Sequence, residues 1–305
     1  MKTSINTAST QGVDPNSPPP EGSGSVGPRI PGPVVTSRPP SLLGDLREIF
    51  LEQVEYRDLL LTMTQRDLLL RYKQTFMGFA WAVFMPLVNT FIFSVIFTRV
   101  ATLDTGGVPY PVFAYCGLVF WNYFVSALKF SATSLTSNAN LVTKVYFPRE
   151  IFPLSAVLVS LFDLAVGATL LVPVMLWYKI SVTSAILFLP VVLIVHTLFT
   201  IAMALLLAMG NLFYRDVKYL FEIVLAVWML GTSVVYPVDL IGGWLGMLFM
   251  FNPLTPIIDA YRSVLLRGEL PAAGPFALAS VCAVFLLVVS WLAFHRSEFK
   301  FAENV

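Results

Sequence analysis

Two ionisable side chains, Asp163 and His196, lie inside long apolar stretches of the sequence. A carboxylate and an imidazole at such positions are groups that relay protons in membrane pumps and transporters. They can also make structural hydrogen bonds. The stretch from 152 to 178 is rich in Leu, Ile, Val and Phe, and their insertion free energy outweighs the roughly 2.5–3.5 kcal/mol that one aspartate costs. The composition therefore favours a structural role for Asp163 and leaves proton coupling as the alternative.

The sequence lacks the motifs of nucleotide hydrolysis. No G-x-x-x-x-G-K-[ST] phosphate loop occurs, and the two histidines lie far apart. No G-x-S-x-G elbow nominates a nucleophile, although a Ser/His/Asp arrangement stays open. Cys116 and Cys282 both fall in apolar runs, where a thiol packs as a small hydrophobe. We therefore expect a chain that is not an enzyme and that holds no metal, cofactor or disulfide of its own.

Basic side chains gather beside the apolar stretches, as in "RDLLLRYKQTFMGFAWAVFMPL" at 66–87. At such positions they can anchor a helix at the membrane surface and contact lipid phosphates. The cations expected to do so are Arg66, Arg71, Lys73, Arg149 and Arg215.

Aromatic residues make up 14% of the chain and are concentrated near the start of the stretch at 109–129. They fit an interfacial belt combined with helix packing, and they also fit a pathway lined with flat apolar faces along which sugar rings slide. The candidates for lining such a lumen are Tyr110, Phe113, Phe120, Trp121 and Phe124.

The elements that must position these residues are membrane helices. Hydrophobic residues form 57% of the chain and charged residues only 12%, against about 25% charged residues in an average soluble domain. A helix needs about 20 apolar residues to cross the hydrocarbon layer. Six stretches meet that length: 78–100, 109–129, 151–178, 185–213, 218–237 and 274–294. The net charge of +1 gives no reason to expect nucleic acid as a partner.

Orientation follows from the cations beside these stretches, because the side richer in Lys and Arg stays in the cytosol. Arg66, Arg71, Lys73, Lys144, Arg149, Arg215, Lys218, Arg296 and Lys300 share one side. An even number of spans then puts both termini in the cytosol. Before the spans, residues 1–44 are rich in Pro, Gly and Ser and predict a disordered tail. Residues 45–75 predict an amphipathic interface segment, with a solvated helix packed on a partner as the alternative, and 76–305 form the six-span domain.

Two connections differ from simple loops. The outer one, 239–270, is too apolar for a solvated loop and too rich in Gly and Pro for a seventh crossing. It predicts short re-entrant helices at the mouth of a pathway or a plain hydrophobic lid. The other, "SNANLVTKVYFPREIFP" at 137–153, carries exposed aromatic and basic residues that a soluble partner could grip, or it is a mere connector.

Several motifs occur in order along 57–305. They are "RDLLLRYKQTFMGFAWAVFMPL", "PYPVFAYCGLVFWNYF", "LVTKVYFPREIFPL", "GNLFYRDVKYL", "FNPLTPIIDAYR" and "HRSEFKFAENV". Together they resemble the membrane-spanning permease subunits of type-2 ABC exporters for bacterial polysaccharides, including O-antigen (lipopolysaccharide) and teichoic-acid permeases. The tail at 1–44 has no counterpart in that pattern.

The resemblance implies an all-α integral membrane protein of six transmembrane helices, with an N-terminal interface helix at 57–75 and outer gate helices at 239–270. It implies a homodimer that works with two copies of a cytosolic ATPase, which bind ATP and Mg, and that exports an undecaprenyl-linked polysaccharide. The coupling helix that seats on the ATPase would comprise Asn140, Leu141, Val142, Thr143, Lys144, Val145, Tyr146 and Phe147. The outer gate would include Asn252, Pro253, Asp259, Tyr261 and Arg262.

The sequence thus predicts an inner-membrane permease subunit for O-antigen-like polysaccharide. Six helices leave little bore for a hydrated glycan, whereas twelve could enclose one, which supports the dimer independently. One alternative is an exporter of drugs or of another lipid with the same architecture. Another is a proton-coupled secondary transporter that uses Asp163 and His196, and the third is a membrane-embedded glycan-processing enzyme.

Overall fold

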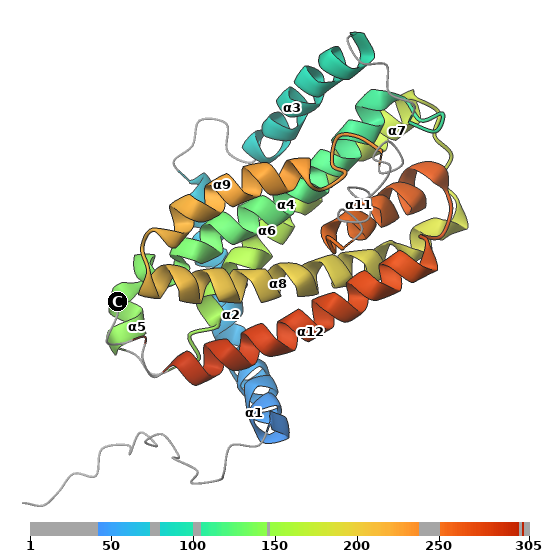
Figure 1. Cartoon of the computed structure of the whole chain (residues 1–305). Coiled ribbons are helices and arrows are strands. Elements are labelled where there is room, and N and C mark those ends of the chain that lie inside the picture. Colours follow the sequence, from blue (N-terminus) through green and yellow to red (C-terminus); the bar gives the residue numbers. More distant parts are fainter. Residues whose placement is uncertain are drawn as a thin grey trace, which may run out of the picture. The chain divides into compact units, whose positions relative to one another are not determined.

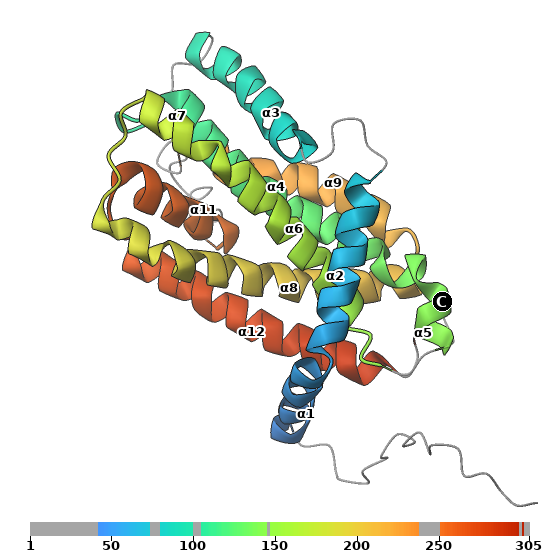
Figure 2. The same ribbon diagram turned by 180° about the vertical axis from the view of Figure 1, so that it is seen from behind.

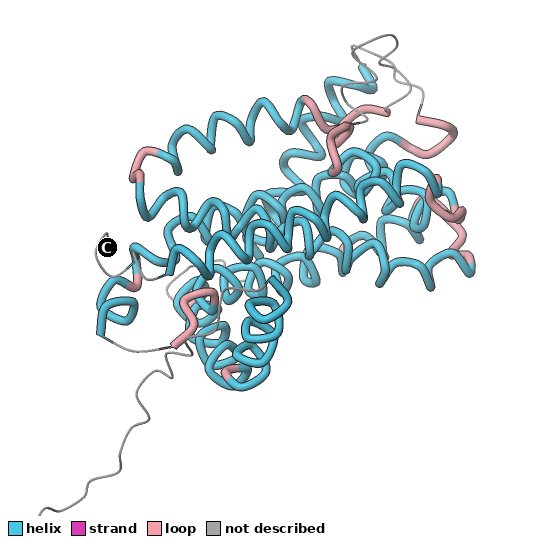
Figure 3. The backbone as a smooth tube through the Cα atoms, turned by 60° about the horizontal axis from the view of Figure 1, so that its bottom comes forward, coloured by secondary structure: helices cyan, strands magenta, loops and turns pink. Residues whose placement is uncertain are grey.

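The computed structural model describes residues 42–73, 80–99, 105–144, 147–237, 251–298 and 301, and every regular element among them is a helix. Figure 3 shows how little of this part of the chain lies in loops. The expected tail at 1–44 falls outside the described residues up to Ser41, and a helix begins at Leu42.

The expected interface segment forms two helices, α1 (Leu42–Glu55) and α2 (Arg57–Tyr72), which meet at Tyr56. α2 packs along α6, and α1 contacts α12. Figure 2 shows α2 crossing the long helices. No residue of α2 is fully buried, as expected for a helix that covers the outside of a bundle.

Four helical stretches are long and apolar enough to cross a membrane among the described residues. They are α4 (Tyr110–Ser137), α6 with α7 (Ile151–Thr169 and Leu171–Trp177), η1 with α8 (Ser184–Phe188 and Leu189–Phe213), and α12 (Ala273–Ser297). The chain is thus an all-helical, multi-pass membrane protein. α4 runs eight residues beyond the expected end at 129, and the third stretch is divided at Leu170.

The two remaining stretches are shorter. α3 (Ala80–Arg99) has its apolar part at Val83–Thr98, and α9 (Val217–Leu230) has 14 residues. At 1.5 Å per residue α9 is about 21 Å long, less than the roughly 30 Å of hydrocarbon. A turn at 231–236 follows it. The count of six spans therefore stays a prediction.

Among these four long stretches of the described residues, α4 is the most buried, with 78% of its most apolar window inside the protein. It packs against α6, α8 and α3, while α12 packs along α8 (Figure 1). The small residues Ala114, Ala127 and Ala132 of α4 are 0–3% exposed, and their short side chains let neighbouring helices approach closely. α4 therefore lies at the centre of the bundle, in contact with α3, α6 and α8.

A second apolar cluster lies where α4 ends and α6 begins, and we call it the α5-end core. It joins residues from four long helices, from α5 (Ala139–Lys144) and, beyond the end of α12, Phe301: Leu135, Val142, Phe152, Leu205, Ala208, Leu212, Phe294 and Phe301. Phe294 and Phe301 meet edge to face with ring centroids 4.9 Å apart.

The outer connection contains α11 (Leu254–Arg262), followed by one turn of π-helix, η3 (Ser263–Arg267). Gly268 ends this turn with φ 72°, a left-handed conformation that favours glycine. Both elements are short and largely buried, consistent with the expected short helices; their depth in a membrane stays a prediction.

Candidate functional site

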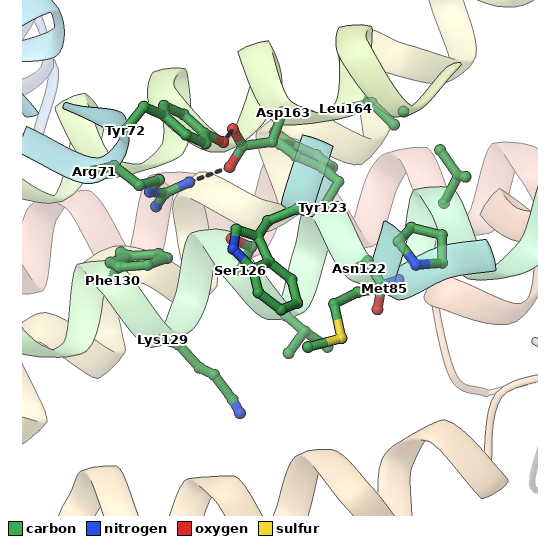
Figure 4. Close-up of a pocket in the computed structure, with 15 residues that line it drawn as sticks. Arg71, Tyr72, Met85, Asn122, Tyr123, Ser126, Lys129, Phe130, Asp163 and Leu164 are labelled. Atoms are coloured by element: carbon green, nitrogen blue, oxygen red, sulfur yellow. Dashed lines mark hydrogen bonds and ion pairs between the residues drawn. The ribbon is translucent and has the colours of Figure 1, made fainter. Parts of the chain in front are cut away.

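Asp163 of α6 lies against the last turn of α2. Its carboxylate accepts hydrogen bonds from the Arg71 guanidinium and the Tyr72 hydroxyl (Figure 4). The Arg71 guanidinium carbon also lies 3.6 Å from the centroid of the Phe130 ring. Both charged side chains are only 15% exposed, and a low-exposure ion pair needs such additional partners to offset desolvation. Arg71 is therefore held inside the protein here, although we expected it at lipid phosphates.

Arg66 and Asp67, earlier in α2, also hold this helix against α4 and α6. The Arg66 guanidinium donates to Asp67 Oδ1 at 2.7 Å and to Asn138 Oδ1 at 3.0 Å, and the Ser155 hydroxyl donates to Asp67 Oδ2 at 2.9 Å. Asn138 follows α4, and Ser155 lies in α6. These bonds connect α2 to both spans. Of the other expected phosphate contacts, Lys73 and Arg215 are exposed.

A cavity of about 580 Å³ lies between α2, α3, α4 and α6 (Figure 4). Asn122, Ser126 and Lys129 line it from one face of α4, since residues three and four apart are neighbours on a helix. Asn122 Nδ2 is buried and has no partner among the described residues. The Lys129 ammonium lies 3.8 Å from a carboxylate oxygen of Glu222 in α9. This polar face contrasts with the buried remainder of α4.

The aromatic residues proposed as lumen lining are packed instead of open. Tyr110, Phe113, Phe120, Trp121 and Phe124 are all 6% exposed or less. Phe120 stacks on Tyr261 with centroids 3.4 Å apart, and Phe124 meets Trp228 edge to face at 5.4 Å. In this structure these rings join α4 to α9 and α11, and a lumen-lining role stays a prediction.

His196 lies among these rings. It is 0% exposed, its ring meets Tyr123 edge to face at 5.1 Å, and its Nδ1 lies 3.4 Å from the Tyr261 hydroxyl. Its Nε2 has no partner among the described residues. These contacts give His196 a packing role between α4, α8 and α11.

The expected gate residues hold the turn after α9. The Asn252 amide donates to Gly231 O at 3.1 Å and Thr232 Oγ1 at 2.7 Å, and its oxygen accepts from Trp228 Nε1 at 3.0 Å. Arg262, 1% exposed, donates to the carbonyls of Ser233 and Val234. Carbonyls at a helix end lack intrahelical partners. Asn252 and Arg262 therefore supply hydrogen bonds to carbonyls in the turn where α9 ends.

The other gate residues support the same arrangement. The Arg262 guanidinium carbon lies 3.6 Å from the Phe113 ring centroid. Asp259 pairs with Arg267 at 2.8 Å, and Pro253 precedes the first turn of α11. Gly117 provides the space, because a Cβ there would lie 2.2 Å from Val234 O and 2.4 Å from Arg262 Nη2.

The first part of the expected coupling stretch, up to Lys144, lies in the short helix α5. Asn140, Thr143 and Lys144 are exposed, Leu141 is partly buried, and Val142 is buried in the α5-end core. Val145 and Tyr146 lie outside the described residues. Phe147 packs on Phe152 with centroids 5.5 Å apart. α5 thus has an inner apolar side and an outer polar side, as a docking element requires.

Arg149 joins α5 to the end of α12. Its guanidinium donates to Val142 O at 3.3 Å and to Glu298 O at 3.0 Å, and its backbone N–H donates to Glu298 Oε1 at 3.0 Å. Next to it, His295 Nδ1 lies 3.3 Å from Glu150 Oε1. Burial raises the pKa of the Glu298 carboxyl to about 7, and the charge of Glu150 adds to this.

Sequence reasoning nominated Arg149 but not Glu150, His295, Glu298 or Phe301. The signal available was the motif "HRSEFKFAENV", in which charged residues alternate with aromatic ones after an apolar span. What it contacts could not be inferred, because its partners lie about 150 positions earlier.

Comparison with known proteins agrees with the geometry. Residues 58–266 match the family described as ABC-2 type transporter. The O-antigen export system permease protein RfbA of Myxococcus xanthus is 29% identical over 257 residues, covering 83% of this chain and 98% of that protein. Two proteins of the same name from Klebsiella pneumoniae are 28% and 26% identical over 249 and 247 residues, each covering 81% of this chain and 94% of the relative.

The family match covers well over half of the chain, and it includes α2, the polar face of α4, α5 and the outer segment with Asn252 and Arg262. The chain therefore belongs to the ABC-2 type transporter family, as a membrane subunit homologous to O-antigen export permeases.

Proposed function

We propose that this chain is the permease subunit of an ATP-driven exporter that passes a lipid-linked, O-antigen-like polysaccharide across the cytoplasmic membrane. The names of its relatives support the substrate class. In members of this family the ATPase is a separate subunit, so the energy comes from a partner that binds ATP and Mg.

The observation that carries this proposal is the polar face of α4. Asn122, Ser126, Lys129 and Thr133 follow one another at spacings of four, three and four, and each is partly or largely exposed. Polar side chains facing hydrocarbon are costly, whereas a water-filled pathway solvates them. We infer that this face lines the translocation path. A hydrated glycan needs such a polar wall.

Enclosing the path requires a second copy. This face of α4 lies in the cavity bordered by α2, α3 and α6, and its Lys129 pairs with Glu222 of α9. The helices α3 and α9 carry large exposed apolar side chains such as Phe91, Val95, Ile223 and Val227. In a homodimer these helices would border the path and contact either the partner or lipid. The positions of the cations support placing the α5 end of the bundle in the cytosol, and an even number of spans would put both termini there.

The outward side of α5 is the proposed docking site of the ATPase, with Asn140, Thr143 and Lys144 in contact. Lys73 and Arg215, both exposed, remain candidates for the lipid pyrophosphate. Arg66, Arg71 and Arg149 have internal partners, so in this proposal they position α2 and α5 and do not meet the phosphates directly.

The test is reconstitution of the chain with its ATPase in vesicles supplied with lipid-linked polysaccharide. ATP-dependent delivery of the glycan across the bilayer is expected, and a deletion strain should lose surface polysaccharide. If the deletion strain keeps its surface polysaccharide but loses export of a drug or another lipid, the substrate is that drug or lipid and not the polysaccharide.

The path itself is tested by thiol labelling in a Cys116→Ala, Cys282→Ala background. Ser126→Cys should react with a charged, membrane-impermeant thiol reagent during ATP turnover. Val281→Cys on α12 is the matched control, because Val281 is 67% exposed on an apolar face and should contact lipid. Equal labelling at both positions, or none at Ser126→Cys, would place the path elsewhere.

A further inference from the structure

The short helix α5 is fastened to α12 as well as to the two spans that it connects. Four charged residues make this contact, and we call them the C-terminal ion-pair cluster: Arg149, Glu150, His295 and Glu298. Two come from the segment after α5 and two from the end of α12. They are about 145 or more positions apart, so the contact is a tertiary one.

Arg149 makes bonds to both sides at once. Its Nε and Nη2 each lie 3.3 Å from Val142 O in α5, and its Nη1 lies 3.0 Å from Glu298 O and 3.4 Å from Glu298 Oε1. A planar guanidinium with five donors is suited to holding several acceptors in fixed directions. A displacement of α5 therefore moves Arg149, and Arg149 moves the end of α12.

Apolar packing makes the same connection. Val142 is 1% exposed and lies in the α5-end core with Phe294 and Phe301, which are both 0% exposed. Phe301 also packs edge to face on Phe213 of α8 at 5.9 Å. Close-packed interiors transmit displacement because they compress little. α5 thus rests on residues of α4, α6, α8 and α12 together.

We infer that the C-terminal ion-pair cluster transmits the movement of α5 to α12, so that the motor acts on the α8–α12 pair and not only on α4 and α6. Arg149 and Glu298 are positioning residues in this step. The inference rests on the proposed function in one respect, which is that an ATPase docks on α5.

The cluster could also be considered for a metal, since Glu150, His295 and Glu298 offer ligand atoms within 4.8 Å of one another. Arg149 already supplies a cation to Glu298, and His295 occupies Glu150 Oε1. Internal pairing therefore accounts for most of this group, although Glu150 Oε2 has no partner among the described residues.

The test compares Arg149→Gln, Glu298→Gln and the double variant in the reconstituted permease–ATPase complex. Asp216→Asn, an exposed acidic residue before α9, is the matched control for loss of a charge. Glycan exported per ATP hydrolysed should fall about tenfold in each single variant, which corresponds to one charged hydrogen bond. Co-purification with the ATPase should stay within about twofold of the unmodified chain.

The double variant distinguishes a shared contact from two independent ones. Its loss should be no larger than that of the more severe single variant, because either change removes the ion pair between Arg149 Nη1 and Glu298 Oε1. Multiplied losses would overturn the inference. So would a loss of co-purification that parallels the loss of export, since the cluster would then only maintain the fold of α5.

A spectroscopic readout follows α12 directly. Cys282 lies on α12 and is partly exposed, whereas Cys116 is buried, so a spin label added to the purified permease before it is combined with the ATPase attaches selectively to Cys282. Its spectrum should change when ATP is added, and Glu298→Gln should abolish that change. An unaltered response in Glu298→Gln would overturn the inference. If the unmodified complex shows this response but exports no polysaccharide, the proposed substrate fails and the transmission step stands.

Discussion

At the scale of single residues, the structure gives Asp163 a partner that sequence alone could not name. The composition of its span favoured a structural role, and Arg71 and Tyr72 supply the hydrogen bonds. Both come from a helix about 90 positions earlier, and hydropathy carries no information about such pairing. The same contact explains why the Arg71 side chain is only 15% exposed.

We expect Arg71→Gln to destabilise the chain by about 3–5 kcal/mol, because it leaves a poorly solvated carboxylate without its cation. The double variant Arg71→Gln, Asp163→Asn should recover part of that loss. Thermal unfolding in detergent measures both. If Asp163 instead relays protons, Asp163→Asn would stop transport while leaving the melting temperature unchanged.

Gly117 gives a second prediction at this scale. In Gly117→Ala the new methyl would overlap Val234 O and Arg262 Nη2, and overpacking of this kind costs about 1–3 kcal/mol. A lower melting temperature and weaker protection of 231–236 from hydrogen exchange are expected. Gly274→Ala is the control, because nothing lies within 4 Å of a Cβ there. Equal effects of the two substitutions would argue against the close approach.

At the scale of elements, hydropathy located the long helices well. It could not show that the third stretch divides at Leu170, because apolar residues continue through that position, or that the short polar segment Gly231, Thr232 and Ser233 ends α9 at Leu230. The turn that ends α9 depends on Asn252 and Arg262, which lie 20 or more residues later. Their side chains donate hydrogen bonds to the carbonyls of Gly231 and Ser233. Their chemistry was visible in the sequence, but their targets were not.

The end of α12 makes a prediction about pH. Glu298 follows α12, and its pKa is raised from 4.5 to about 7. Between these values the folded chain binds more protons than the unfolded chain, so stability should decrease as the pH rises through this window. The melting temperature of the purified chain between pH 5 and pH 8 should show this decrease, and Glu298→Gln should flatten it. A slope unchanged by the substitution would refute the assignment to Glu298.

At the scale of the whole molecule, the face of α4 with Asn122, Ser126 and Lys129 borders a cavity that α2, α3 and α6 also line, and Lys129 is exposed. The family and the substrate class could be predicted from ordered motifs, whereas this face could not, because its exposure depends on where α3 and α9 pack. The predicted lumen aromatics show the same limit, since they carry the right chemistry yet lie inside the core.

We therefore expect the purified permease to contain two copies of the 33.8 kDa chain, alone or with its ATPase. Mass measurement in lipid nanodiscs tests this. A monomer that exports glycan without any ATPase would contradict both the dimer and the family mechanism.

Phe301 has a consequence for how the subunit is made. Translation produces Val142 long before Phe294 and Phe301, yet all three share the α5-end core. In a nascent chain the α5-end core therefore lacks Phe294 and Phe301 until the last span and the residues after it emerge from the ribosome. If the ATPase docks on α5 as proposed, we expect it to assemble only with subunits whose synthesis has passed this point.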